Sequence, residues 1–238
     1  MDINVDEKLS GDELLWRYMD LAKFVSLLDT KSIWLARSDT FRDRREGHFP
    51  DEMRKRIEQA YKGFDDAPSP VKDAEDFQDY LVKNTFISCW HKNFDENMVM
   101  WEIYGKDNNA VAVQTTVDSL KNNTDTSGLV GHSLILQDVI YENSEDEQGN
   151  LLYEQCFFRK RKHFSFEKEV RLSLDTYNRS APTKGNQVGY SVPINSDAVI
   201  NKIFVHPDSS GWYIKAVESI AKKYCISAPV EKGKCGNT

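Results

Sequence analysis

The sequence predicts an α+β protein with mostly antiparallel β-sheet. Segments with strand composition outnumber segments with helical spacing of apolar residues, and the two kinds do not alternate regularly, as they would in a doubly wound fold. The 238 residues contain no internal repeat and no linker rich in Pro, Gly or Ser. We therefore expect one domain over residues 1–238.

In the first half of the chain, one helix has a clear start. Asp20 is of a residue type that caps helix N-termini, and apolar residues then recur at helical spacing, which predicts a short amphipathic helix over 20–30. A second helix is expected from Asp95 to Gly105, because glycine commonly ends helices. Strand composition predicts three strands, at 33–36, 85–90 and 110–115.

A charged segment separates the first two of these strands. From Phe49 to about Lys83, a pattern of Glu, Lys and Arg is followed by a break at Pro68-Ser69-Pro70 and then by a second periodic stretch. Proline disfavours helix both at its own position and at the residue before it. The segment therefore predicts a helical insertion with a loop in its middle.

The second half repeats this mixture of elements. Leu151–His163 is expected to be a helix with Leu152, Cys156 and Phe157 facing inward, and its basic end would lie at the negative end of the helix dipole. A last helix is expected around 214–221. Strands are expected at 133–142, 169–174, 189–192 and 202–206.

The composition is that of a soluble globular protein. The 31 Lys and Arg residues against 38 Asp and Glu residues give a formal charge of −7, so the whole chain carries no basic footprint for nucleic acid. No apolar run approaches the roughly 18 residues that cross a bilayer, and the first residues are acidic and polar, unlike a secretory signal. We therefore expect a cytoplasmic protein with no membrane partner.

The cysteines predict neither a metal site nor disulfides. Cys89, Cys156, Cys225 and Cys235 show no CxxC spacing and no paired histidines, so reduced thiols and no metal are expected. The motifs GxGxxG, GxxxxGK[ST], HExxH and GxSxG are absent. A metal-dependent nuclease is a weaker alternative, because acidic clusters such as Glu142–Glu147 lack paired ligands at metal spacing.

Positive charge is nevertheless concentrated in three places. Basic residues cluster at 42–45, at 54–56 and at 159–163. Such runs are usually solvated helix faces, and none of these is interleaved with aromatic residues as a base-stacking platform would be. A local nucleic-acid surface and a solvated helix face both remain open.

Three segments place polar or aromatic residues where the pattern alone would predict core. They are Leu15–Tyr18 (LWRY), Phe86–Trp90 (FISCW) followed by Trp101 and Tyr104, and Phe166–Leu172 (FEKEVRL). In the third segment, strand alternation puts Glu167, Glu169 and Arg171 on one face.

Each of these segments also has a purely structural explanation. Arg17 can stack on a neighbouring ring and pair with a carboxylate. Ser88 can bond to the backbone, and the face of Glu167, Glu169 and Arg171 can be a solvated sheet surface. No single segment decides between structure and function.

The order of the three segments resembles the Arg, Ser, Glu arrangement of ADP-ribosyltransferases. Leu15–Glu46 also resembles the opening of an uncharacterised bacterial family, which begins with aromatic-Arg-Tyr and runs through a helix into a strand. FISCW, MVMWEIYG and FEKEVRL match later signatures of that family in order. Members often occur with phage-defence genes, and the family is similar to ADP-ribosyltransferase toxins that modify DNA and RNA. The resemblance covers about Leu14 to Ser227.

The resemblance implies a split sandwich of two packed, mainly antiparallel sheets and an NAD-dependent ADP-ribosyltransferase, with NAD as co-substrate. Glu169 would accept a hydrogen bond from the ribose and stabilise its developing positive charge, while Glu167 would activate the acceptor. Arg17 would hold the pyrophosphate, and Ser88 would orient Glu169. The other residues expected to contact NAD are Tyr18, Trp34, Ser38, Trp101, Tyr104 and Arg171.

Two departures from the family pattern and several alternatives stay open. The turn that usually contains Asn-Asp-Pro reads Arg42-Asp43-Arg44 here, and a full Ser-Thr-Ser triplet is absent around Ser88. Core packing is an alternative role for Trp34 and Trp101. The acceptor can be a nucleic acid or a protein, and an antitoxin or another defence-system partner is implied. The rival class is a non-catalytic protein that senses a nucleotide or binds a partner on the same fold.

Overall fold

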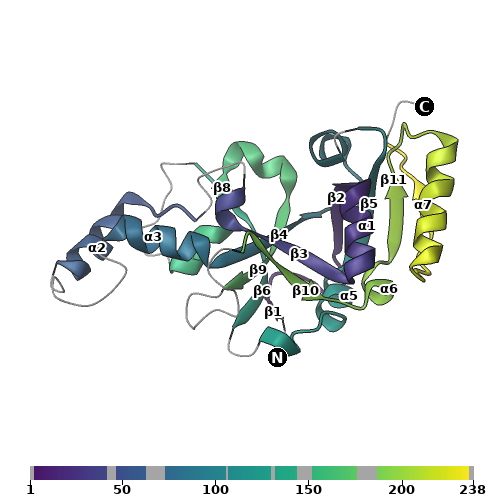
Figure 1. Cartoon of the computed structure of the whole chain (residues 1–238). Coiled ribbons are helices and arrows are strands. Elements are labelled where there is room, and N and C mark those ends of the chain that lie inside the picture. Colours follow the sequence, from purple (N-terminus) through teal and green to yellow (C-terminus); the bar gives the residue numbers. More distant parts are fainter. Residues whose placement is uncertain are drawn as a thin grey trace.

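A large mixed β-sheet forms the centre of the molecule (Figure 1). The computed structural model describes residues 3–41, 47–62, 73–105, 107–129, 132–143, 152–175 and 187–235. Eight strands follow one path: β1 (Asn4–Val5), β6 (Ser133–Asp138), β9 (Glu169–Asp175), β4 (Thr85–Lys92), β2 (Leu14–Asp20), β5 (Ala110–Thr116), β11 (Lys202–Val205) and β12 (Val230–Lys232). Strand β3 (Ser32–Arg37) pairs with β4, and β10 (Gly189–Pro193) pairs with β3.

Most neighbouring strands are antiparallel, as the sequence predicts. Among the described strands of the large sheet, β1 with β6 and β11 with β12 are the parallel pairs. A separate two-stranded parallel sheet joins β7 (Ile140–Glu142) to β8 (Arg159–Arg161). By strand pairing, the described strands form one large sheet and this small one, so the expected sandwich of two packed antiparallel sheets is not confirmed.

The large sheet divides along one edge of β4. At one end of that edge His91 pairs with Trp16 of β2, and at the other end Ile87 pairs with Ala36 of β3. Among the described strands, none pairs with Ser88–Trp90 on that edge, while β9 pairs with β4 along its opposite edge. Strands β2 and β3 therefore diverge and leave a gap in the sheet.

One face of the sheet carries the main hydrophobic core. Side chains such as Leu15, Val113 and Leu172 pack there against helices α1 (Leu21–Thr30), α5 (Val117–Asn122) and α7 (Gly211–Lys223). The short helix α6 (Ser196–Val199) contributes Val199 to the same core. Each of these helices buries one apolar stripe, so the core is built from half-buried helices on a fully covered sheet face.

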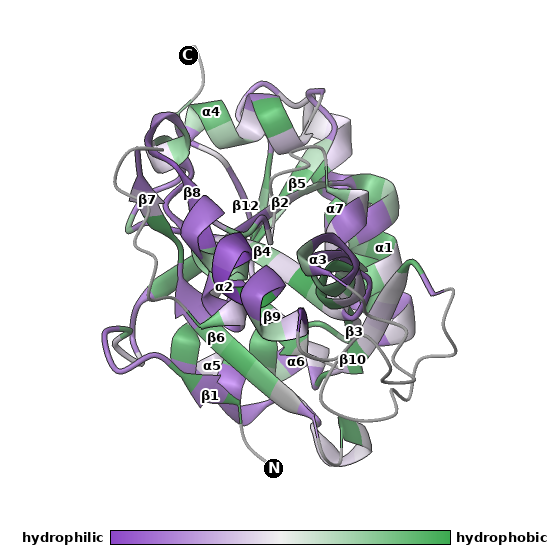
Figure 2. Ribbon diagram, turned by 90° about the vertical axis from the view of Figure 1, so that its left-hand side faces the viewer, coloured by the Kyte–Doolittle hydropathy of each residue, from purple (hydrophilic) through white to green (hydrophobic). Residues whose placement is uncertain are grey.

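Two smaller apolar clusters lie on the opposite face. One joins Ile87 to Phe157, α2 (Asp51–Tyr61) and α3 (Ala74–Lys83). Most residues of α2 are hydrophilic (Figure 2). The other joins Trp16 and Tyr18 to α4 (Met98–Met100) and the π-helical turn Trp101–Gly105. Polar side chains lie on this face between the two apolar clusters.

Several predicted elements are confirmed with small shifts. Helix α1 begins after Asp20, whose side chain accepts a hydrogen bond from the backbone N–H of Lys23. The segment expected to be a helical insertion contains α2 and α3, with residues 63–72 between them outside the described part. The expected strand 133–142 is interrupted at Val139 and forms β6 and β7.

One predicted helix is wrong, and one strand was not predicted. Residues 152–163, the described part of the expected helix, do not form one α-helix. A 3-10 helix (Tyr153–Phe158), strand β8 and a second 3-10 helix (Lys162–Glu167) occupy this region, and Leu152 is 67% exposed. Pairing of β8 with β7 overrides the helical spacing. Strand β2 was not expected, because Leu15, Trp16, Tyr18 and Met19 are all buried and give no simple alternation.

The membrane-span, metal-site and charged-segment expectations concern the following features of the described residues. No helix among the described residues is long and apolar enough to cross a bilayer. No group of three or more His, Cys, Asp or Glu residues in the described part is arranged to hold a metal ion. The basic cluster at 42–45 and most of the acidic segment 142–147 lie outside the described residues.

Candidate active site

A cavity of about 680 Å³ lies where β2 and β3 diverge from β4. Its walls come from β2, α1, β3 and β4, together with Tyr104, Glu167 and Glu169. The volume is within the range of roughly 300–1,000 Å³ that is typical of small-molecule sites. Residues that are far apart in the sequence, including Arg17 and Glu169, therefore line one cavity.

Strand register decides which face of the sheet each of these side chains occupies. On β4 and β9, His91 lies opposite Glu169 and Cys89 lies opposite Arg171, so these four share one face. Ser88 lies opposite Leu172 and belongs to the other face, with the main core. The register therefore does not bring Ser88 to Glu169, and Cys89 takes the position beside that carboxylate.

Arg17 projects from β2 on the same face as Ser88. Its Nη2 donates to the carbonyl oxygen of Trp34 at 3.1 Å, and its Cζ lies 5.6 Å from the centroid of the Trp90 ring. No carboxylate among the described residues forms an ion pair with it. Burial lowers the pKa of Arg17 to about 10, while the nearby Cys89 raises it. The guanidinium thus stays charged at neutral pH, with donors left for an anion.

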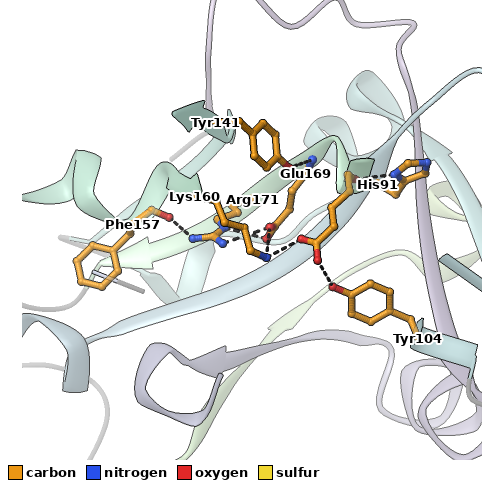
Figure 3. A network of polar contacts seen from close by, with 8 residues as sticks. His91, Tyr104, Tyr141, Phe157, Lys160, Glu169 and Arg171 are labelled. Carbon is orange, nitrogen blue, oxygen red and sulfur yellow. Dashed lines mark hydrogen bonds and ion pairs between the residues drawn. The ribbon is translucent and has the colours of Figure 1, made fainter. Parts of the chain in front are cut away.

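Glu169 is the most strongly held carboxylate of the cavity (Figure 3). Arg171 Nε donates to Oε1 at 2.8 Å and Nη2 donates to Oε2 at 3.2 Å, and Lys160 Nζ lies 3.2 Å from Oε2. Burial alone would raise the pKa of Glu169, but Arg171, Lys160 and a hydrogen bond from Cys89 outweigh it and hold the pKa at about 2. Glu169 is therefore ionised at neutral pH although it is buried.

Glu167 lies beside Glu169 and shares its cation. Lys160 Nζ donates to Glu167 Oε2 at 2.5 Å, and the hydroxyl of Tyr104 donates to Oε1 at 3.2 Å. Burial and, after it, the charge of Glu167 raise the pKa of Tyr104, so its phenol stays protonated. Glu167 belongs to the 3-10 helix before β9 rather than to the strand, yet it is buried and lines the cavity. The solvated-surface explanation of this segment is wrong.

His91 presents a neutral imidazole to the same cavity. Its Nδ1 lies 2.6 Å from the backbone carbonyl oxygen of Glu167, which can only accept, so Nδ1 carries the proton. Burial lowers the pKa of His91, with an opposing effect of the hydrogen bond to Glu167. Nε2 is buried without a partner among the described residues and is therefore an available acceptor.

The remaining predicted residues divide into two groups. Tyr18, Trp34 and Tyr104 line the cavity, and Trp34 is 47% exposed at its edge. Ser38 donates to the carbonyl oxygen of Val82, and Trp101 packs behind Tyr18 with ring centroids 4.9 Å apart; neither lines the cavity. Arg171 also stays outside the lining, since it lies behind Glu169 and donates to the carbonyl oxygen of Phe157 at 2.5 Å.

Three residues of the site were not predicted: Cys89, His91 and Lys160. Cys89 and His91 follow from the register of β4 with β9, which the sequence does not contain as a pattern. Lys160 belongs to a basic run that we interpreted as a solvated helix end, but the buried carboxylates draw its ammonium inward. The basic run at 159–163, which lies just before the strand that carries Glu169, was the sequence feature that could have indicated a role for Lys160.

Comparison with known proteins gives a distant structural likeness. No family model and no curated protein matches the sequence. A structure of Thermus sp. 2.9 DarT in complex with ADP-ribosylated ssDNA is 12% identical over 98% of each chain, with a TM-score of 0.38. The same protein in complex with carba-NAD+ is 11% identical over 94% of this chain and 97% of that chain, with a TM-score of 0.40. Similarity at this level carries no argument about function.

Proposed function

We propose that the protein binds NAD in the cavity and transfers its ADP-ribose to a nucleic acid or a protein. The observation that carries this proposal is that Arg17, which has no carboxylate partner among the described residues, and two ionisable carboxylates line one largely buried cavity. A dinucleotide needs both features, because its diphosphate is anionic and its ribose develops positive charge when the nicotinamide leaves.

Arg17 would bind the diphosphate. A guanidinium donates in a planar fork that matches phosphate oxygens, and a charge-assisted hydrogen bond is stronger in a site from which water is largely excluded. The carbonyl oxygen of Trp34 uses one of its donors, and the ring of Trp90 supports it from one side. The position of the guanidinium is thus fixed before a ligand binds.

The carboxylates would act on the ribose and the acceptor. The bond between the anomeric carbon and the nicotinamide nitrogen breaks, and its electron pair leaves with nicotinamide. Glu169 stabilises the positive charge on the ribose, and the acceptor forms the new bond to the anomeric carbon. Glu167 accepts the proton that the acceptor loses. Lys160 forms ion pairs with both carboxylates and helps to hold the pKa of Glu169 low.

Aromatic rings would enclose the nicotinamide. Tyr18, Trp34 and Tyr104 line the cavity and offer flat apolar faces of suitable size. Tyr18 is fixed because its hydroxyl accepts a hydrogen bond from the backbone N–H of Asn97 at 2.9 Å. A ring wall of this kind excludes water from the reacting carbon.

A second candidate, a nucleotide-binding protein without turnover, is favoured by the state of Glu169. A carboxylate has about four lone-pair positions, and Arg171, Lys160 and Cys89 together provide four hydrogen bonds. A ribose hydroxyl must displace one of them. A protein in which the ribose hydroxyl never displaces one of these hydrogen bonds would bind the nucleotide without releasing nicotinamide.

Nicotinamide release separates the two candidates. The transferase predicts release from NAD in the presence of single-stranded DNA, RNA or protein acceptors, and a loss of at least about a hundredfold in Glu169→Gln. Binding of ADP-ribose by calorimetry without any release supports the sensor. Absence of both binding and release contradicts both candidates. An antitoxin or another defence-system partner stays a prediction.

A further inference from the structure

Two residues of β4 that line the cavity each have a buried polar side-chain atom without a hydrogen-bond partner among the described residues. Ser88 is 1% exposed and Trp90 is 2% exposed, and neither Ser88 Oγ nor Trp90 Nε1 has a partner among the described residues. Both residues line the cavity. Burying a polar group without a partner is costly and rare in native proteins, so each such group calls for an explanation, and a ligand is one.

These two atoms and Arg17 lie on the same side of the sheet. Ser88 and Trp90 are two residues apart on one strand face, which separates their Cα atoms by roughly 6.5–7 Å. The guanidinium of Arg17 lies over the Trp90 ring, with Cζ 5.6 Å from its centroid. A tryptophan Nε1 and a guanidinium can only donate hydrogen bonds, and a serine hydroxyl can also donate.

The cavity is therefore divided by charge. Register places Arg17, Ser88 and Trp90 on one face of the sheet and Glu169 on the other. Glu167 lies on the side of Glu169, because both contact Lys160. A ligand that satisfies the donor side must offer several acceptor oxygens and negative charge. A diphosphate has these properties, whereas a neutral sugar or base offers no charge to a guanidinium.

We propose that Ser88 Oγ–H and Trp90 Nε1–H are ligand donors and, with Arg17, form a subsite for the diphosphate of the bound nucleotide. This inference rests on the proposed function and refines it, since it assigns a role to Trp90 and replaces the expected role of Ser88. Two neutral donors beside one guanidinium distribute the contacts over both phosphates. The carboxylate side is then left for the ribose that reacts.

Trp90→Phe tests the inference, because it removes one N–H and keeps a flat ring under Arg17. The affinity for ADP-ribose and for inorganic pyrophosphate should fall by roughly tenfold or more, while the melting temperature without ligand stays equal or rises, since an unpartnered buried donor has been removed. Ser88→Ala should behave in the same way and serves if Trp90→Phe does not fold. Trp212→Phe, at a residue that is 66% exposed on α7, is the matched control.

The outcomes separate the subsite from the function. Unchanged affinity for both probes together with a lower melting temperature in Trp90→Phe overturns the subsite, because the N–H then serves the fold, for instance through a buried water. Nicotinamide release by the wild type would in that case leave the transferase intact. Weakened binding of both probes in a protein that never releases nicotinamide supports the subsite and contradicts the transferase. No binding of either probe to the wild type overturns both.

Discussion

Glu169 and Arg171, two residues apart on β9, form a bidentate ion pair inside the protein, with Nε 2.8 Å from Oε1 and Nη2 3.2 Å from Oε2. Both side chains are almost completely buried, and Arg171 also donates to the carbonyl oxygen of Phe157. The pair holds the carboxylate at the edge of the cavity in a fixed orientation. A preorganised charge of this kind needs little rearrangement when a ligand binds.

Arg171→Leu should unfold more easily than the wild type by about 3–5 kcal/mol, because it leaves a buried carboxylate with less compensation. Urea denaturation at pH 7 measures the difference. The control is Lys202→Ala, which breaks the exposed pair of Lys202 with Glu231 and should cost about 1 kcal/mol or less. A loss in Arg171→Leu as small as in the control would contradict the structural role of the pair.

The low pKa of Glu169 makes stability depend on pH in a defined direction. The folded-state pKa is about 2, below the value of roughly 4.3 in an unfolded chain, so this group stabilises the fold above pH 4–5 and the stabilisation is lost as the pH falls toward 2. The loss should be about 3 kcal/mol. Urea midpoints at several pH values should fall less steeply in Glu169→Gln, although this variant starts from a lower stability. Parallel pH curves for the two proteins would be inconsistent with a depressed pKa.

Lys160→Met should raise the pKa of Glu169, because the ammonium lies 3.2 Å from its Oε2 and is one of the charges that lower this pKa. The variant also removes the 2.5 Å ion pair with Glu167. The acid limb of nicotinamide release should therefore move to higher pH, and the rate at neutral pH should fall by at least about tenfold. The control is Lys162→Met, which removes an exposed lysine of the same basic run. Equal pH profiles for the two variants would exclude a special role for Lys160.

Gly189→Ala should weaken ligand binding without a large loss of stability. A Cβ at this position would clash with the indole ring of Trp34, which lies at the edge of the cavity and is only half-buried, so the ring must shift. ADP-ribose affinity should fall by roughly tenfold by calorimetry. Gly128→Ala, where a Cβ meets nothing within 4 Å, is the control. If Gly189→Ala binds ADP-ribose with wild-type affinity, Trp34 does not contact the ligand.

The tautomer of His91 can be measured by NMR. Because Nδ1 lies 2.6 Å from a carbonyl oxygen, ¹⁵N shifts should show a proton on Nδ1, and the ring should titrate below the ordinary value of about 6.5. Protonation would come first in the unfolded chain, so this residue also favours the fold more at neutral pH than at acid pH. A proton on Nε2 would contradict the contact.

The secondary structure was predictable where local signals agree. Asp20 caps α1, and apolar spacing and strand composition located α1, β3, β4 and β5. Strand β2 was missed because both of its faces are buried, and the helix expected at 151–163 was replaced by β8, which gains its pairing from β7. Tertiary pairing overrides local propensity in such segments.

The site was predictable in residue type but not in geometry. Spacing alone placed Glu169 and Arg171 on one face, and both occupy one face of β9. Which residue of β4 lies beside Glu169 depends on register, and a shift of one residue exchanges Ser88 for Cys89. The division of the sheet at β4, which opens the cavity, results from long-range pairing that leaves no pattern in the sequence.

The central claim is that one dinucleotide spans the cavity from Arg17 to the carboxylates, and a structure of the protein with ADP-ribose tests it most directly. We expect the diphosphate within hydrogen-bond distance of Arg17 and the free ribose beside Glu167 and Glu169. A diphosphate bound outside this cavity, or a ribose far from both carboxylates, would contradict the account.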